Sequence, residues 1–438
     1  MPPVRRARAR HAAKTPYNAA GWLSRRRSSS SCEEESDNDG SGALLTSLSD
    51  DVLFDILPHV LSDASDVARF ASTCPRWGRF VATHAARISR VIRSPTRFLP
   101  RIALGFFHHE NGVNRFLRAR ARLVGSAQPR FFPAASASQF VRIAQPLGGD
   151  VLFDYAQPVA SRNGHVVFEL RRDARTDGLR LGVFSPMTGD MAVLPSLSGD
   201  DSPGSYACTI LAGDDLTDNA LVDGSFFFRV LLIYNRRSFT ALRCYSSDTG
   251  SWSPERRKPG GKMRSHTLRR LGHAVVVDGV AYWPLPGEAF GVRMSDSSMD
   301  VSSVPYRLPG NWPDLRLLGV SSDGKKLRYI TAGFVSRVTL SVSLRATYFE
   351  DVDRSIHDVH VRVPGLRVTG TTPIKLRWFG EKSGTVLFTV GEADGGVFAL
   401  NMANGTVEKL ADGGGFHVCS NIYGYEMDHA ALLASLAY

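Results

Sequence analysis

The sequence predicts an α+β multidomain protein in which a small three-helix unit precedes a large all-β domain. Apolar residues in 48–92 recur at helical spacing, whereas short β-rich runs separated by Gly, Asp and Asn turns take over from about residue 134. The 438 residues are too many for one simple core. We therefore expect a disordered basic and Ser-rich tail (1–42), a helical domain (43–93), an Arg-rich connector (94–133) and the all-β domain (134–438).

The helical unit carries a start signal for each of its three helices. Ser49 is a good N-cap, and the two aspartates after it suit the positive end of a helix dipole. Pro58 predicts that this first helix ends or kinks at Leu57. Ser65 can cap a second helix, and Pro75 suits the first turn of a third. Three helices this short cannot bury all their apolar surface among themselves, so the unit needs a partner or a neighbouring domain.

The β-rich part is built from short strands joined by hairpin turns. Asn-Gly and Asp-Gly pairs, as at Asn163-Gly164 and Asp278-Gly279, mark the turns. A strand followed by a turn ending in Thr-Gly recurs near Gly189 and Gly250, and such degenerate repeats indicate a β-propeller of six or seven blades. A pair of β-sandwiches is the alternative. The clearest strand candidates are 165–170, 179–184, 226–234, 240–245, 273–277, 280–283, 327–331, 338–344, 359–363, 385–390, 397–400 and 407–410.

Composition indicates a soluble globular protein that contacts no membrane. Hydrophobic residues make up 43% of the chain and charged residues 22%, and no run of about 18 apolar residues could form a membrane-spanning helix. The five cysteines are scattered and never form a C-x-x-C pair, which favours a reducing compartment and excludes a zinc module of that type. We expect the nucleus, the cytoplasm or both.

The net charge of +11 is unevenly placed. Residues 87–130 hold ten arginines and one acid, Glu110. This stripe is read as a solvated linker, and binding of nucleic acid or chromatin through it is the alternative function. No helix-turn-helix, zinc-finger or RNA-binding signature accompanies it, so nucleic acid is the less favoured partner.

Motifs of enzymes and of metal sites are absent from the sequence. No G-x-x-x-x-G-K-[ST] phosphate loop occurs, and the stretch after Gly319 falls short of a G-x-S-x-G nucleophile elbow. His357 and His360 are three residues apart, which puts them on opposite faces of a strand. We expect a non-catalytic protein with no cofactor and no metal; an enzyme with a dispersed active site remains an alternative.

The helical stretch resembles the F-box. The motif opens with Leu-Pro, continues with acidic residues and an Ile/Leu helix, and closes with Cys-x-x-Trp; its matches here are Leu48, Asp50, Asp51, Val52, Leu53, Ile56, Leu57, Val67, Cys74 and Trp77. Ser49 stands where the family has proline, and Pro58 shortens the first helix. The β-rich repeats and the ending at 419–436 resemble the propeller-like domains of plant F-box proteins, in particular those of grasses. A helical subdomain packed on the rest of the chain is the alternative.

This resemblance implies a substrate-recognition adaptor of an SCF-type cullin–RING E3 ubiquitin ligase. The F-box would dock on a Skp-family adaptor, and through it on cullin, while the β domain would bind the protein to be ubiquitinated. The ligase chemistry would belong to other subunits. The residues expected to contact or support the Skp-family interface are Leu48, Val52, Ile56, Leu57, Val67 and Trp77.

Overall fold

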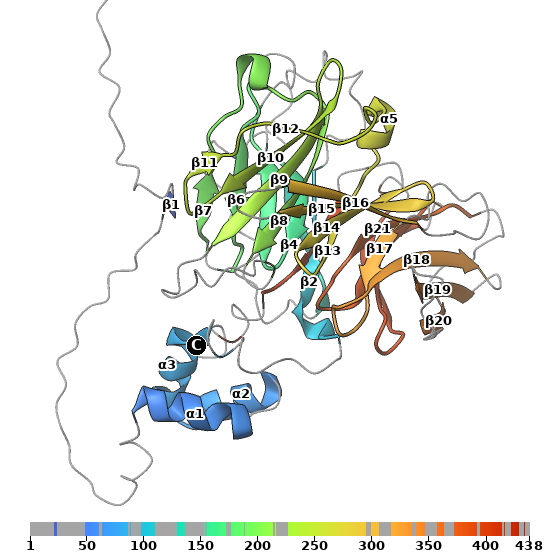
Figure 1. Ribbon diagram of the computed structural model, residues 1–438. Helices are drawn as coiled ribbons and strands as arrows, with labels where there is room; N and C mark the ends of the chain where they lie inside the picture. Colours follow the sequence, from blue (N-terminus) through green and yellow to red (C-terminus); the bar gives the residue numbers. More distant parts are fainter. Residues whose placement is uncertain are drawn as a thin grey trace, which may run out of the picture.

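The protein folds into a helical unit and a ring of six β-sheets arranged like the blades of a propeller (Figure 1). This computed structural model describes residues 22–23, 49–60, 64–85, 88, 98–109, 129–135, 153, 156–171, 177–187, 189–212, 215, 227–294, 299–305, 317–334, 339–346, 357–362, 372–391, 395–413, 416, 422–428 and 433. The mostly β fold with few helices confirms the predicted β-propeller class, and no β-sandwich pair is seen among these residues. No helix in the described part is both long and apolar enough to span a membrane.

The helical unit contains α1 (Asp50–Val60), α2 (Ala64–Ala71) and α3 (Pro75–Thr83). The backbone N–H of Val52 donates to Ser49 Oγ over 3.5 Å, so Ser49 caps α1 as predicted. Helix α1 does not end at Leu57, which was one of the two outcomes expected from Pro58, but continues to Val60, because a proline removes one backbone donor without stopping the chain from remaining helical. The expected N-cap of α2 was wrong. Helix α2 begins before Ser65, which therefore lies in its first turn and not at its N-cap.

The core of the helical unit includes a residue from the other end of the chain. Leu53, Phe54, Val67 and Phe80 pack with Leu433, whose side chain is fully buried. The unit is thus completed by a residue about 350 positions away in sequence, which meets part of its need for a neighbour.

Five of the six blades are formed by strands that are consecutive in sequence, apart from one edge strand that is added to the first. The first consists of β4 (Gln157–Arg162), β5 (His165–Glu169), β6 (Leu181–Phe184) and β7 (Met191–Val193), and the second of β8 (Tyr206–Ala212), β9 (Phe228–Asn235), β10 (Thr240–Ser246), β11 (Ser251–Trp252) and β12 (Arg256–Arg257). The third consists of β13 (Val275–Val277), β14 (Val280–Leu285), β15 (Glu288–Met294) and β16 (Met299–Pro305). The fourth consists of β17 (Leu317–Val320), β18 (Leu327–Phe334), β19 (Thr339–Ala346) and β20 (His357–Arg362), and the fifth of β21 (Ile374–Phe379), β22 (Thr385–Val390), β23 (Gly396–Asn401) and β24 (Val407–Asp412). Short elements between or beside the blades are the 3₁₀ turns η1 (Pro100–Ile102) and η6 (Gly199–Asp201) and the helix α5 (Ser265–Leu268).

The sixth blade closes the ring by joining both ends of the domain. Strand β25 (Ile422–Glu426) pairs with β2 (Ala103–His108), which pairs with β3 (Arg130–Pro133). Both β2 and β3 lie within 94–133, the range that the sequence suggested as an Arg-rich connector. Every residue of β2 is buried, so this segment belongs to the ring core and not to a solvated connector.

The edge of the first blade is extended by β1 (Trp22–Leu23), which pairs antiparallel with β7. These two residues fall within the tail that we expected to be disordered. An edge strand leaves backbone N–H and C=O groups unpaired, and a short extended segment can satisfy them.

The hairpin turns and the core follow the sequence pattern closely. Asn163-Gly164 and Asp278-Gly279 both have positive φ at each residue, as the type I′ turn requires. The apolar core lies mainly in layers between adjacent blades, and Trp283 and Trp378 are buried in two of these layers. Each blade thus buries its faces against its neighbours, which makes the ring cooperative.

Shortening Leu433 should destabilise the helical unit although the residue lies outside it in sequence. We expect Leu433→Ala to cost about 2–5 kcal/mol in that unit, because it opens a cavity in a closed core. Val52→Ala, at a side chain that is 41% exposed, should cost less than about 0.5 kcal/mol. Amide hydrogen exchange in α2 and α3 measures both effects, and equal exchange in the two variants would contradict the packing described here.

Candidate functional site

One face of α1 presents apolar side chains to solvent. Val52 and Ile56 are 41% and 42% exposed, and they are the exposed large hydrophobic residues among those the structure describes. They lie four positions apart, so they are neighbours on one side of the helix. Leu53 and Phe54 lie on the buried side, with 3% and 6% exposure. Helix α1 therefore has a packed face and an apolar face that nothing covers among the described residues.

The exposed face has an acidic border. Asp50, Asp51 and Asp55 are all exposed on α1. Asp50 lies 3.3 Å from Nε2 of His84, which also contacts the ring of Phe54 edge-on. The face therefore combines an apolar centre with carboxylates around it, which is the composition of many protein-binding surfaces.

The structure separates the residues expected at the Skp-family interface. Val52 and Ile56 lie on the exposed face, whereas Val67 is fully buried in the helical core. Trp77 is half-buried, and its ring lies 3.7 Å from that of Phe70, so it supports α2 and α3. Leu48 lies outside the described residues. Leu57 lies in α1, but its side chain is outside the description.

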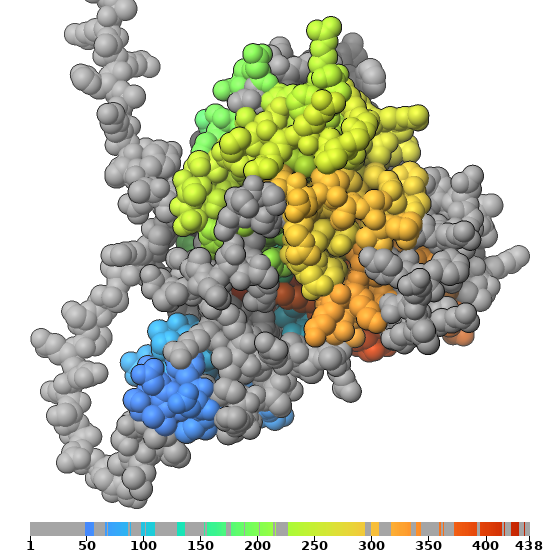
Figure 2. Space-filling model, viewed as in Figure 1, coloured from blue at the N-terminus to red at the C-terminus, as the bar shows by residue number. Residues whose placement is uncertain are grey.

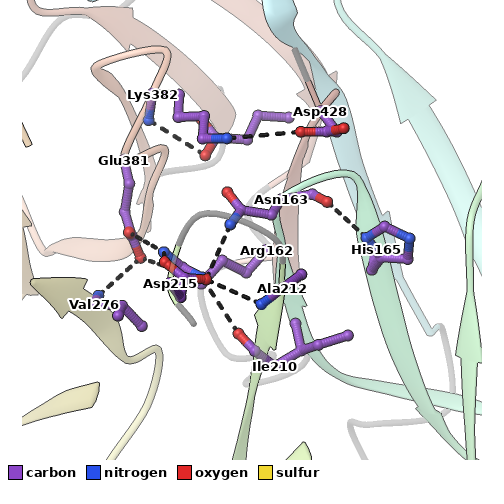
Figure 3. Close-up of polar contacts among 11 residues, drawn as sticks. Arg162, Asn163, His165, Ile210, Ala212, Asp215, Val276, Glu381, Lys382 and Asp428 are labelled. Carbon is purple, nitrogen blue, oxygen red and sulfur yellow. Dashed lines mark hydrogen bonds and ion pairs between the residues drawn. The ribbon is translucent and has the colours of Figure 1, made fainter. Parts of the chain in front are cut away.

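A separate cluster of polar side chains is buried in the ring and centred on Arg162 at the end of β4 (Figure 3). We call Arg162, Asp215 and Glu381, with the groups bonded to them, the axial network. Its guanidinium donates to Glu381 from Nε and Nη2, over 2.7 and 2.8 Å, and to Asp215 from Nη2 over 2.8 Å. A further bond from Nη1 reaches Asp215, and another, 3.4 Å long, reaches the carbonyl of Ile210. The three charged side chains are 5–10% exposed.

This axial network joins residues from four blades. Glu381 follows β21 and also accepts the backbone N–H of Val276 in β13, over 3.1 Å. Asp215 follows β8 and accepts from the amide of Asn163 over 3.2 Å. Arg162 therefore links the first, second and fifth blades directly, and Glu381 adds the third.

The sixth blade is tied in by neighbouring bonds. The carboxylate of Glu426 in β25 accepts the backbone N–H of Lys382 over 3.3 Å and that of Ser383 over 3.0 Å. Lys382 Nζ lies 3.6 Å from Asp428. The closing strand is thus held by hydrogen bonds to the turn after β21 as well as by its pairing with β2.

Burial and charge explain how this cluster is ionised. Burial alone would lower the pKa of Arg162, but Asp215 and Glu381 raise it well above its ordinary value, so the guanidinium is charged. Burial raises the pKa of Glu381, and Arg162 offsets only part of that rise. Burial lowers the pKa of His165 to about 4 and that of His273 to about 3. Both histidines are therefore neutral near pH 7.

Within the described residues, no group of three or more His, Cys, Asp or Glu side chains could hold a metal ion. The buried charges of the axial network are used by one another and by backbone groups. We therefore interpret it as a clasp for the ring. The network was not predicted from sequence, since Arg162, Asp215 and Glu381 lie 53 and 219 positions apart.

The Arg-rich stripe at 87–130 lies largely outside the described residues. Arg101 falls in η1, without a described side chain, and Arg130 is exposed in β3 with its guanidinium 5.8 Å from the ring centre of Phe132. Of the ten arginine side chains in this stripe, the structure therefore describes only that of Arg130.

Comparison with known proteins adds only distant likenesses. No family model matches the chain, and no curated protein matches it. A putative 6-phosphogluconolactonase from Bacteroides uniformis is similar over 70% of this chain and 95% of its own, with 12% identity and a TM-score of 0.31. A putative 6-phosphogluconolactonase from Bacteroides fragilis is similar over 70% of this chain and 94% of its own, with 11% identity and a TM-score of 0.30. A structure from a study of two prolyl endopeptidases is similar over 76% of this chain and 54% of its own, with 10% identity and a TM-score of 0.30. At these TM-scores, the likenesses carry no inference about activity.

Replacing Arg162 with methionine should destabilise the ring in a pH-dependent way. The change leaves Asp215 and Glu381 buried without their cation, at a cost of about 3–5 kcal/mol near pH 7. A buried carboxyl with a raised pKa holds its proton more tightly in the folded state than in the unfolded state, so the stability it contributes is largest at low pH and is lost as pH rises. The deficit of Arg162→Met relative to the unaltered chain should therefore shrink between pH 8 and pH 5.

Urea unfolding at both pH values measures this deficit. The double variant Arg162→Met, Glu381→Gln should recover part of the stability at pH 8, because it removes one of the two uncompensated charges. A deficit that is the same at both pH values and in both variants would contradict the charge-pairing role.

Proposed function

We propose that this chain is a substrate-recognition adaptor of an SCF-type cullin–RING E3 ubiquitin ligase, acting in the nucleus, the cytoplasm or both. Its F-box-like helical unit would dock on a Skp-family adaptor, and its ring would hold the protein to be ubiquitinated. The observation that carries the proposal is the exposure of Val52 and Ile56 on the helix whose residues resemble the F-box.

The packing of α1 supports docking through this face. A helix covered on one side by its own core and apolar on the other is a surface that a partner helix can cover. Burying a Val or Ile side chain fully is worth about 1.5–3 kcal/mol, so these two positions can act as anchors of an interface. The alternative, a helical subdomain packed on the rest of the chain, would need this face to be covered, and no described residue covers it.

The residues of the helical unit divide into two roles under this proposal. Val52 and Ile56 would contact the Skp-family adaptor, whereas Val67 and Trp77 would hold the helices in place. Leu433 would do the same from the C-terminal end of the chain. The transfer of ubiquitin would be carried out by other subunits, with no catalytic group required in this chain.

A double change on the exposed face tests the proposal directly. Val52→Asp with Ile56→Asp should weaken binding of a purified Skp-family adaptor by at least about tenfold, because two apolar anchors become charged. The fold should be retained, since neither side chain belongs to the buried core. Calorimetric titration of the full chain with the adaptor measures the affinity.

The control variant carries Arg69→Asp and Arg79→Asp, which place carboxylates at exposed positions on α2 and α3. Adaptor binding should be changed less than about twofold by this control. Failure of the unaltered chain to bind the adaptor, or equal loss in both double variants, would refute docking through α1.

A further inference from the structure

A strongly basic surface lies on the outer part of the second blade. Residues 256–270 contain seven lysines and arginines and no aspartate or glutamate. Six of these seven are exposed, and Lys258 is half-buried. We call this surface the basic ridge; it consists of Arg256, Arg257, Lys258, Lys262, Arg264, Arg269 and Arg270.

The ridge is part of the folded ring and not a loose loop. Strand β12, which holds Arg256 and Arg257, pairs with β10, and the N–H of Lys258 donates to the carbonyl of Thr240 over 2.8 Å. The segment that follows is anchored by Met263, Leu268 and Leu271, which pack into the core between the second and third blades. Because these three side chains point into the core, the cations between them point to the surface.

Several of these cations are held in position by local contacts. The guanidinium of Arg257 lies 5.5 Å from the ring centre of Phe239, and Lys258 Nζ lies 5.7 Å from that of Phe290. Lys262 Nζ donates to the carbonyl of Arg237 over 2.9 Å, and Arg269 Nε donates to Ser205 Oγ over 3.1 Å. Side chains ordered in advance lose less entropy when a ligand binds.

Six of the seven ridge cations, all but Arg256, have no carboxylate partner within the described part of the chain. Glu255, next to the ridge, is already bound to Arg236 and to the hydroxyl of Tyr234. Like charges this close repel one another, so the arrangement favours an anionic ligand.

The ridge also lies far from the candidate docking face. In Figure 1, β12 and α5 are at the upper end of the ring and α1–α3 are below it. Figure 2 shows the same yellow-green segment covering the upper front of the molecule. A ligand on the ridge would therefore leave Val52 and Ile56 accessible.

We infer that the basic ridge binds an acidic polypeptide segment of the protein that the ring receives. The inference rests on the proposed function in taking the ligand to be a protein. Its chemistry is carboxylate recognition by arginines, several of which are held in place. The surroundings do not favour single-stranded nucleic acid, because Phe239 and Phe290 lie beneath ridge cations and no described Phe, Tyr or Trp side chain is exposed for base stacking.

Fluorescence anisotropy with a labelled oligoglutamate peptide tests the inference on the full chain. The variant Arg257→Gln, Arg264→Gln, Arg270→Gln should bind the peptide about tenfold more weakly than the unaltered chain, since each exposed pair contributes a modest part of the affinity. The control Lys325→Gln, Lys326→Gln, Arg362→Gln removes the same charge from exposed positions in the fourth blade, and should change binding less than about twofold.

Absence of peptide binding, or equal loss in the two triple variants, would overturn the inference. A labelled oligothymidylate of matched charge that binds the ridge as tightly as the peptide would also overturn it, in favour of nucleic acid. Titration of the Skp-family adaptor on the same ridge variant separates the two proposals. The ridge variant should bind the adaptor as tightly as the unaltered chain does. If the unaltered chain does not bind the adaptor at all, the proposed function is rejected, whereas the peptide-binding result for the ridge can still be interpreted.

Discussion

The pairing of β25 with β2 is the constraint on which the rest of the structure depends. It joins Ile422–Glu426 to Ala103–His108 and so turns five consecutive sheets into a closed ring. Because β2 follows the helical unit in sequence and Leu433 follows β25, the same pairing brings Leu433 within reach of the helical core. Ring closure and completion of the helical unit are therefore coupled. A chain opened at the sixth blade would lose both.

The axial network strengthens this closure from inside the ring. Burying three charged groups is costly, and the cost is offset because Arg162 donates to both oxygens of Asp215 and of Glu381, while Glu381 Oε1 and Asp215 Oδ2 each also accept a backbone or amide N–H group. A purely apolar centre could be as stable. The charged arrangement adds geometric specificity, since each hydrogen bond forms only when a particular turn of a particular blade is in place. We interpret it as fixing how the first, second, third and fifth blades register with one another.

Local patterns predicted the local structure well. The capping of α1 by Ser49, the start of α3 at Pro75 and the turn at Asn163-Gly164 each depend on residues close in sequence, and each was found. The sequence also predicted the propeller and a range that includes six blades. Non-local contacts could not be predicted in this way. The burial of Leu433, the place of β2 in the last blade and the Arg162 network join residues from 53 to more than 300 positions apart. The same limit applies to the docking residues, since helical spacing groups Val52 and Val67 as apolar but does not say which one is exposed.

Under the proposed function, separate parts of the molecule have separate tasks: the exposed face of α1 docks, the ring holds a ligand, and the buried clasp keeps the blades in register. Docking would then involve α1 and leave the ring unchanged. Hydrogen–deuterium exchange of the full chain, with and without a purified Skp-family adaptor, measures this most directly. We expect slower exchange confined to the helical unit, greatest in Asp50–Val60, with the exchange of the six blades unaltered. Protection spread over the blades, or none in α1 at saturating adaptor, would contradict the account.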